Sequence, residues 1–600
     1  MPGLNLKNYL SKTISKDNWE HIGFKKRAGV LFPLFSAYSK NSFGIGDLGD
    51  LKLIIDWAKS TGNSIIQLLP MNEVGPNFCP YDALSSFALE PAYICLKDFP
   101  GLSSKKFNLP EQSNYIDYAV KEEKIKLLWS FYLAQDLSEA FDFEEFQRKN
   151  AYWLSDFALF KELKDYHNGK PWYEWDERFK NRSIEALSRF KQDNIEKITF
   201  WMWLQWILFK QFKEASSYAS AKKIFVKGDL PVLVSRDSSD VWSHPEFFKL
   251  EFAAGAPPDM YAAFGQRWGM PTYNWQNIEK NDYRYIKEKL KYAEEFYDIL
   301  RVDHVVGLFR IWSIPFNDPQ ESAGLNGVFD PVDEQFWCRQ GQDILKVMVK
   351  NTKMLFCAED LGVVPKCCTD TLLEFGICGN DVQRWVKDWN KKHDFLLPEE
   401  YRQLAVAMLA THDTANWRAW WKYEAGTVDK DMFLRKCNDR NIDFEKINDK
   451  LFDAGKSYNG RLRWRKEIDS PDKLLWELGR KEEEVRDFID IYKDTYAEKE
   501  KLWKILDCCG KIDEEATPEL LDKIFAFIFD SRAVFCINLI NDYLSLGNIF
   551  KGDPYQYRVN LPGTVSPKNW SLRLPISLEE MLKHPLNKQI RKMITDSGRA

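Results

Sequence analysis

The chain has 600 residues, of which 44% are hydrophobic and 29% are charged, and its formal net charge is -5. These proportions are typical of a folded globular protein with a large core. Both signs of charge are interspersed, without the basic stripe that follows nucleic-acid phosphates, so we expect no nucleic-acid partner. No apolar run reaches the roughly 18 residues that cross a bilayer, so we expect no membrane association.

Eleven cysteines are scattered along the chain, and the closest pairs are Cys367-Cys368 and Cys508-Cys509. No repeated Cys-x2-Cys motif predicts a zinc site, and an odd total favours a reducing compartment over a disulfide framework. The N-terminal residues are polar and lack the apolar segment of a secretory signal. The sequence therefore predicts a cytoplasmic protein.

Eight short apolar runs have the length and composition of buried strands, and helical patterns separate most of them. Strand, helix, strand in repetition predicts a parallel sheet. The eight predicted strands span residues 28–34, 64–70, 223–229, 299–303, 353–359, 376–384, 404–411 and 533–540. We expect an α/β fold in which they close into one (β/α)8 TIM barrel that forms a single catalytic domain over residues 1–600.

Two long segments interrupt this pattern. Residues 111–221 have a helical period, many aromatic residues and no buried-strand run, which predicts a helical insertion between strands two and three. Residues 429–515 are heavily charged and predict a second helical insertion, between strands seven and eight. Only residues 541–600 follow the last strand, so no separate C-terminal β domain is expected.

Three acidic residues follow predicted strands closely. Asp303 and Glu359 are the last residues of the fourth and fifth strands, and Asp413 lies two residues after the seventh. Each alone is as easily a helix cap or a surface ion pair. In a parallel barrel, however, the carboxyl ends of the strands form the face that carries active sites. Two carboxyl groups suffice to process a glycosidic bond and a third can bind sugar hydroxyls, so the sequence predicts a glycoside-processing enzyme.

The surroundings of each acid suggest its role. Arg301 precedes Asp303 by two residues on the same strand face and is expected to hold Asp303 ionised, as a nucleophile requires. Glu359 ends an apolar, uncharged strand, where desolvation raises the pKa of a carboxyl group, as an acid/base catalyst requires. Asp413 then suits binding of the donor sugar's hydroxyls.

Further motifs occur along the chain, and they are Phe43-Gly44-Ile45-Gly46-Asp47-Leu48-Gly49-Asp50, Gln67-Leu68-Leu69-Pro70, Cys79-Pro80-Tyr81-Asp82, Gly265-Gln266-Arg267-Trp268-Gly269, Arg301-Val302-Asp303-His304, Ala358-Glu359-Asp360-Leu361-Gly362, Thr411-His412-Asp413 and Asn560-Leu561-Pro562-Gly563-Thr564. Together and in this order they resemble the 4-α-glucanotransferases, the amylomaltases and disproportionating enzymes of glycoside hydrolase family 77. The resemblance runs from about residue 27 to residue 575, nearly the whole chain.

The resemblance implies the same roles for the three acids and adds substrate-binding residues, which are Tyr81, Asp229, Arg301, His304, His412, Tyr261, Phe264, Gln266 and Trp268. Tyr81 is expected to stack beside the donor sugar, and the long segment 255–275, which lacks a regular period, to cover the groove near the acceptor. The residue types alone also allow a core position for Tyr81, an ordinary turn for Asp229, and structural roles for the two histidines.

We expect the protein to transfer α-1,4-glucan segments among maltose, maltooligosaccharides and glycogen by a retaining mechanism, without a metal or organic cofactor. An α-amylase-like hydrolase would use the same three acids and is the first alternative. A non-catalytic glucan-binding protein is the second, although it would be expected to have lost at least one of them. Chain-length preference and oligomeric state are not predicted.

Overall fold

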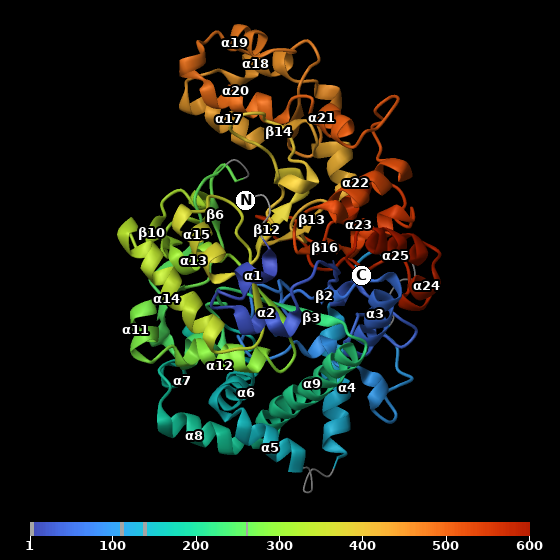
Figure 1. Cartoon of the computed structure of the whole chain (residues 1–600). Coiled ribbons are helices and arrows are strands. Elements are labelled where there is room, and N and C mark those ends of the chain that lie inside the picture. Colours follow the sequence, from blue (N-terminus) through green and yellow to red (C-terminus); the bar gives the residue numbers. More distant parts are fainter. Residues whose placement is uncertain (1–4, 108–112, 136–140, 260–261) are drawn as a thin grey trace.

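The computed structural model describes residues 5–107, 113–135, 141–259 and 262–600. Its centre is a sheet of eight parallel strands (Figure 1). These strands are β1 Arg27–Leu31, β2 Ile65–Gln67, β3 Phe225–Leu230, β8 Ile299–Val302, β11 Leu355–Ala358, β12 Gly379–Val382, β13 Ala405–Met408 and β16 Phe535–Leu539. Each pairs with the strand that precedes or follows it among these eight, and β1 also pairs with β16.

The sheet closes between β11 and β12. Cys357 forms a parallel bridge with Cys378, just before β12, and the Ala358 N–H donates to the Cys378 carbonyl oxygen at 2.7 Å. The predicted (β/α)8 barrel is therefore confirmed, and each of the eight predicted strand ranges overlaps one of its strands. Most were recognisable because helices cover the outside of the barrel and side chains fill its inside, so these strands are mainly apolar. β12 is less apolar, since it contains Asn380 and Asp381.

The chain between β2 and β3 carries a helical layer that Figure 1 shows at the bottom of the molecule. Its helices are α4 Ala119–Leu133, α5 Phe141–Lys149, α6 Ala151–Tyr166, α7 Glu177–Lys180, α8 Ile184–Asp193 and α9 Ile195–Ala221. Aromatic pairs join α9 to the barrel, as where Phe212 stacks on Phe296 with 4.5 Å between ring centroids. Although α9 has 27 residues, no helix in the described ranges has both the length and the apolar character needed to cross a bilayer.

The chain between β13 and β16 carries a second group of elements, at the top of Figure 1. Its elements are α17 Lys430–Asp439, α18 Phe444–Leu451, α19 Pro471–Leu478, α20 Arg486–Thr495, α21 Glu498–Ile505 and the antiparallel pair of β14 Thr427–Asp429 with β15 Arg461–Arg463. They enclose a hydrophobic core of their own, in which Phe433 contacts Phe452 and Phe488 edge to face. This short strand pair was not predicted, because three-residue strands leave no period in the sequence.

A four-stranded antiparallel sheet lies outside the barrel and changes one expectation. Its strands run in the order β10 Val328–Asp330, β9 Ile311–Pro315, β5 Phe252–Ala256 and β6 Gln266–Arg267. The segment 255–275 is therefore not simply irregular, since β5, β6 and the short β7 Thr272–Tyr273 lie in or overlap it. The local pattern concealed these strands because β5 pairs with β9, a strand about 60 residues away, in the register Ala254 to Ser313.

Candidate active site

The three acids lie at the carboxyl ends of barrel strands and line one groove. Asp303 directly follows β8, Glu359 directly follows β11, and Asp413 lies in the loop after β13. The groove encloses about 2880 Å³. Parallel strands end at a common edge, so residues distant in sequence share this groove, as the sequence predicted.

Arg301 connects two carboxylates at the base of the groove. Its Nη1 lies 2.8 Å from Oδ1 of Asp303 and 2.7 Å from Oδ1 of Asp229. The expected contact between Arg301 and Asp303 is therefore present, and Arg301 lowers the pKa of Asp303 as expected. Burial raises the pKa of Asp303 to about 6, because desolvation and the carboxylate of Asp229 outweigh the lowering by Arg301.

Glu359 accepts hydrogen bonds from two backbone N–H groups. His304 donates to Oε2 at 2.8 Å and Leu361 donates to Oε1 at 3.1 Å. His304 adopts a left-handed backbone conformation (φ 43°), which is costly for a residue with a side chain and is typical of functional sites. Burial raises the pKa of Glu359, although Arg301 and the His304 N–H oppose this effect. The direction of the shift agrees with the sequence-based expectation.

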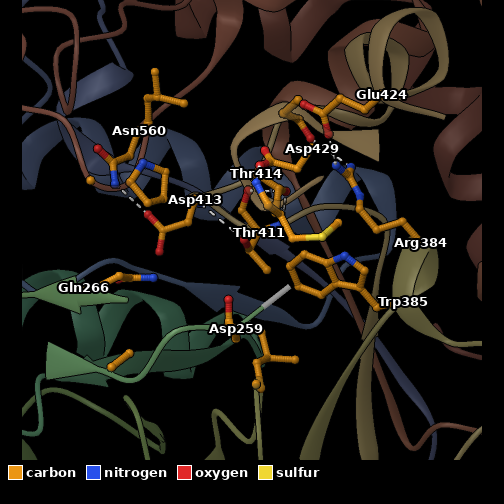
Figure 2. Close-up of a pocket in the computed structure, with 18 of the residues that line it drawn as sticks. Asp259, Gln266, Arg384, Trp385, Thr411, Asp413, Thr414, Glu424, Asp429 and Asn560 are labelled. Carbon is orange, nitrogen blue, oxygen red and sulfur yellow. Dashed lines mark hydrogen bonds and ion pairs between the residues drawn. The ribbon is translucent and has the colours of Figure 1, made fainter. Parts of the chain in front are cut away.

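Asp413 has the most polar surroundings of the three. Its Oδ2 lies 3.2 Å from Nε2 of His412, and its Oδ1 accepts a 2.7 Å hydrogen bond from Nδ2 of Asn560 (Figure 2). Burial would raise the pKa of Asp413, but His412 and Asn560 lower it to about 2. Asp413 is therefore an ionised acceptor and not a proton donor, which suits binding of sugar hydroxyls. Asn560 was part of a predicted motif but had no predicted role.

Tyr81 contacts Asp229 and His412. Its hydroxyl donates to Oδ2 of Asp229 at 2.8 Å, and its ring stacks on His412 with 5.2 Å between centroids. Tyr81 lines the groove, whereas Asp229 is buried beneath it and does not. Asp229 therefore lies where it can orient Tyr81 and Arg301.

The segment that carries β6 forms one wall of the groove. Gln266 and Trp268 line it, and the Trp268 indole N–H donates to Oε1 of Gln266 at 2.9 Å. Trp268 also meets His304 edge to face at 4.9 Å. Figure 2 shows Gln266 across the groove from Asp413. Gly255 permits the close pairing with β6, because a Cβ atom there would lie 2.0 Å from the Gln266 carbonyl oxygen.

Two further residues of that segment, Phe264 and Tyr261, were predicted to bind substrate. Phe264 is 52% exposed and is not among the residues that line the groove. Tyr261 lies outside the described residues. Of the three predicted residues of this segment that the structure describes, Gln266 and Trp268 line the groove and Phe264 does not.

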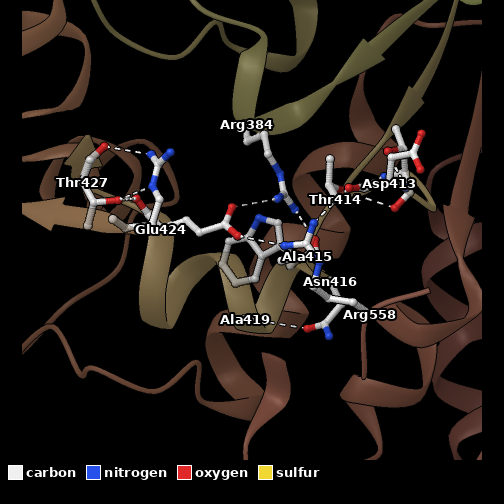
Figure 3. Close-up of polar contacts among 12 residues, drawn as sticks. Arg384, Asp413, Thr414, Ala415, Asn416, Ala419, Glu424, Thr427 and Arg558 are labelled. Atoms are coloured by element: carbon white, nitrogen blue, oxygen red, sulfur yellow. Dashed lines mark hydrogen bonds and ion pairs between the residues drawn. The ribbon is translucent and has the colours of Figure 1, made fainter. Parts of the chain in front are cut away.

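Two arginines hold the loop that carries Asp413, and a glutamate bridges them (Figure 3). Arg558 donates to the Asp413 carbonyl oxygen at 3.0 Å, and Arg384 donates to the Ala415 carbonyl oxygen at 2.8 Å. Glu424, the last residue of a π-helical turn, lies 3.4 Å from Nη1 of Arg558 and 3.6 Å from Nη1 of Arg384. No sequence pattern indicated this network, since its three charged residues come from distant segments.

The site contains the groups that a retaining transfer between sugars requires. Asp303 and Glu359 are two carboxyl groups of raised pKa on one groove, and Asp413 stays ionised beside them. Among the described residues, no group of three or more histidines, cysteines and acids is arranged to hold a metal ion. The arrangement fits acid, base and nucleophilic chemistry by side chains alone.

Comparisons with known proteins agree with this geometry. A profile of glycoside hydrolase family 77, described as 4-alpha-glucanotransferase, matches residues 32–578. A 4-alpha-glucanotransferase of Chlamydia caviae is 31% identical over 583 residues, which cover 95% of this chain and 94% of that protein. One from Aquifex aeolicus is 32% identical over 71% of this chain and 86% of its own length.

Solved structures show the same fold. The amylomaltase from Streptococcus agalactiae, solved in complex with acarbose, matches with a TM-score of 0.71 at 21% identity, over 96% of this chain and all of that one. The amylomaltase from Corynebacterium glutamicum matches with a TM-score of 0.70 at 19% identity, over 97% of this chain and 76% of that chain.

Proposed function

Because this chain belongs to glycoside hydrolase family 77, the 4-α-glucanotransferases, we infer that it is an enzyme that transfers segments of α-1,4-glucan from one chain to another. The observation that carries this proposal is the placement of three carboxylates at the ends of β8, β11 and β13, on one groove. The pKa values of Asp303 and Glu359 are raised and that of Asp413 is lowered, which supports a role for Asp413 that differs from those of the other two.

We assign the first step to Asp303 and Glu359. The carboxylate of Asp303 attacks the anomeric carbon of the donor glucan, and the bond to the departing glycosidic oxygen breaks. Glu359 gives its proton to that oxygen, so the departing chain leaves with a free hydroxyl group. The donor segment is then held as an ester of Asp303.

The second step reverses the first with another glucan chain. Glu359, now ionised, removes the proton from the 4-hydroxyl of the acceptor, whose oxygen attacks the anomeric carbon and releases Asp303. Two inversions give net retention. Asp413 binds hydroxyls of the donor sugar more strongly as charge develops, and the stacked rings of Tyr81 and His412 lie beside it.

The hydrolase alternative differs only in what enters the second step. Transfer prevails when an acceptor sugar occupies the site and water is kept out. Gln266, which Figure 2 shows across the groove from Asp413, and Trp268, which donates to Gln266, are our candidates for holding the acceptor. Aromatic and amide side chains offer a stacking surface and hydroxyl partners, which supports transfer over hydrolysis.

A product ladder from pure maltotriose tests the proposal. We expect glucose and a series of longer maltooligosaccharides, with the total number of reducing ends nearly constant. A rise in reducing ends that matches the loss of maltotriose would identify a hydrolase. No product from maltotriose or from maltose plus glycogen would favour a binding protein.

We also propose which glucans the enzyme uses and where in the cell it acts. Maltose, maltooligosaccharides and glycogen are the glucans we propose as donors and acceptors. A cytoplasmic location fits the eleven cysteines, all of which are free thiols. Incubation of labelled maltose with glycogen, followed by debranching, would show whether glycogen ends accept glucose units.

A further inference from the structure

The groove extends well beyond the three acids. At about 2880 Å³ it exceeds the roughly 300–1000 Å³ of ordinary small-molecule pockets, so it has room for several sugar units. Part of its lining comes from the elements inserted between β13 and β16. Residues of this part are Asp429, Arg461, Asp469, Arg486, Asp490 and Tyr496. Neighbouring carboxylates and guanidinium groups are suitable partners for sugar hydroxyls.

Trp389 lines the groove on the segment that follows β12. It is partly exposed, and its indole N–H donates to the Trp385 carbonyl oxygen at 3.2 Å, which fixes the ring relative to its own segment. The ammonium group of Lys387 lies 5.0 Å from the Trp389 ring centroid. An indole held in this way presents a rigid apolar face beside a polar surface, the combination that stacks on the C–H face of a sugar.

The segment with Trp389 is fastened to the inserted elements. Lys387 donates to the Asp494 carbonyl oxygen at 3.1 Å, and Nδ1 of His393 lies 2.7 Å from Oδ1 of Asp494. Lys501 donates to the His393 carbonyl oxygen at 2.8 Å. Because these contacts order the segment with Trp389 in the absence of sugar, binding of a sugar to Trp389 costs little conformational entropy.

We propose that Trp389 and the groove-facing side of residues 429–515 form a distal binding site for an α-1,4-glucan. This site holds glucose units that are several residues away from the bond that is cleaved. The inference rests on the proposed transferase function and deepens it: the insertion makes the enzyme prefer long chains to short ones. Maltotriose is too short to span both the acids and this site, whereas amylose can occupy both.

Chain-length dependence tests the proposal. We would measure kcat/KM with maltotriose and with amylose for Trp389→Ala, Trp389→Phe and the native protein. Trp389→Ala removes one aromatic ring on which a sugar can stack. It should lower the ratio of kcat/KM with amylose to kcat/KM with maltotriose by about tenfold. Trp389→Phe keeps a smaller ring and should lower it less.

Trp476→Ala is a matched control. Trp476 lies on α19 within the same insertion, is 82% exposed and does not line the groove, so its removal should leave the ratio unchanged. An unchanged ratio in Trp389→Ala, or an equal fall with both substrates, would overturn the proposal.

A binding measurement keeps the test independent of turnover. Migration of Asp303→Asn protein in a gel containing amylose should be retarded, and the double variant with Trp389→Ala should be retarded less. Equal retardation would count against the distal site. If the native protein only hydrolyses maltotriose, the proposed transferase function fails, while the chain-length ratio and the gel still decide whether the distal site exists.

Discussion

Arg301 forms an ion pair with Asp303, with 2.8 Å between Nη1 and Oδ1, and shares the same nitrogen with Asp229. The cation is therefore divided between two carboxylates. Desolvation by burial, together with the carboxylate of Asp229, explains why the pKa of Asp303 is about 6 despite an arginine in direct contact. Because we propose that Asp303 attacks as a carboxylate, we expect its protonation to set the acidic limit of the reaction.

We expect kcat/KM to fall as the pH drops below about 6, the pKa of Asp303. α-Maltosyl fluoride is the donor to use. Because fluoride departs without an acid, the protonation state of Glu359 does not affect the rate of this step. Arg301→Gln removes the cation that lowers this pKa, so the acidic limb should move to higher pH. Asp229→Asn removes a carboxylate that raises it, so the limb should move to lower pH. A limb that stays in place in both variants would contradict this account.

Asp303→Asn should lower transferase activity by more than about 10³-fold, because an amide cannot form the glycosyl ester. Mass spectrometry of the enzyme treated with a 5-fluoro glycosyl fluoride donor would locate the covalent sugar. We expect the label on the peptide that contains Asp303. A label on Glu359 or Asp413 would show that the roles are exchanged.

The barrel and the three acids were predictable because their signals are local. Most of the strands are buried and mainly apolar runs, and each acid stands at or just beyond the end of a strand. The wall formed by β5 and β6 was not predictable, since β5 pairs with the distant strand β9 and β6 pairs with β5. The same holds for Glu424, whose contact with Arg558 joins residues 134 positions apart and leaves no spacing to recognise.

The pKa of Asp303 depends on a contact that the sequence does not reveal. The neighbouring Arg301 was visible in the sequence, and its lowering of the pKa was expected. The opposing carboxylate of Asp229 comes from β3 and reaches Arg301 only because β3 and β8 pair with these two residues in register. The sign of the net shift thus depends on the fold.

Glu359→Gln should abolish transfer from maltotriose and still form the glycosyl-enzyme from α-maltosyl fluoride, whose leaving group needs no proton. Azide should then restore turnover, because an anionic nucleophile needs no general base. Product analysis by chromatography would detect the maltosyl azide. Asp413→Asn is the comparison variant and should not respond to azide; the opposite pattern would reverse these two assignments.

Glu424 is expected to act on catalysis through Asp413. It neutralises Arg384 and Arg558, the two arginines that hold carbonyl oxygens of the loop after β13 (Figure 3). Glu424→Gln keeps the shape of the side chain but leaves two neighbouring cations without their shared anion. The loop should then shift, and small misplacements of catalytic groups cost up to about a hundredfold in rate. We therefore expect kcat with maltotriose to fall by about ten- to a hundredfold, with a smaller change in KM.

A double-mutant cycle distinguishes positioning from a general loss of structure. If Glu424 works through Asp413, then Glu424→Gln should add little to the loss already caused by Asp413→Asn. Glu515→Gln is the matched control, because Glu515 pairs with Lys422 in the same π-helical turn and its side chain is 48% exposed. That variant should keep native kcat. Multiplicative losses in the double variant, or an equal loss in Glu515→Gln, would show that Glu424 stabilises the turn and has no specific effect on Asp413.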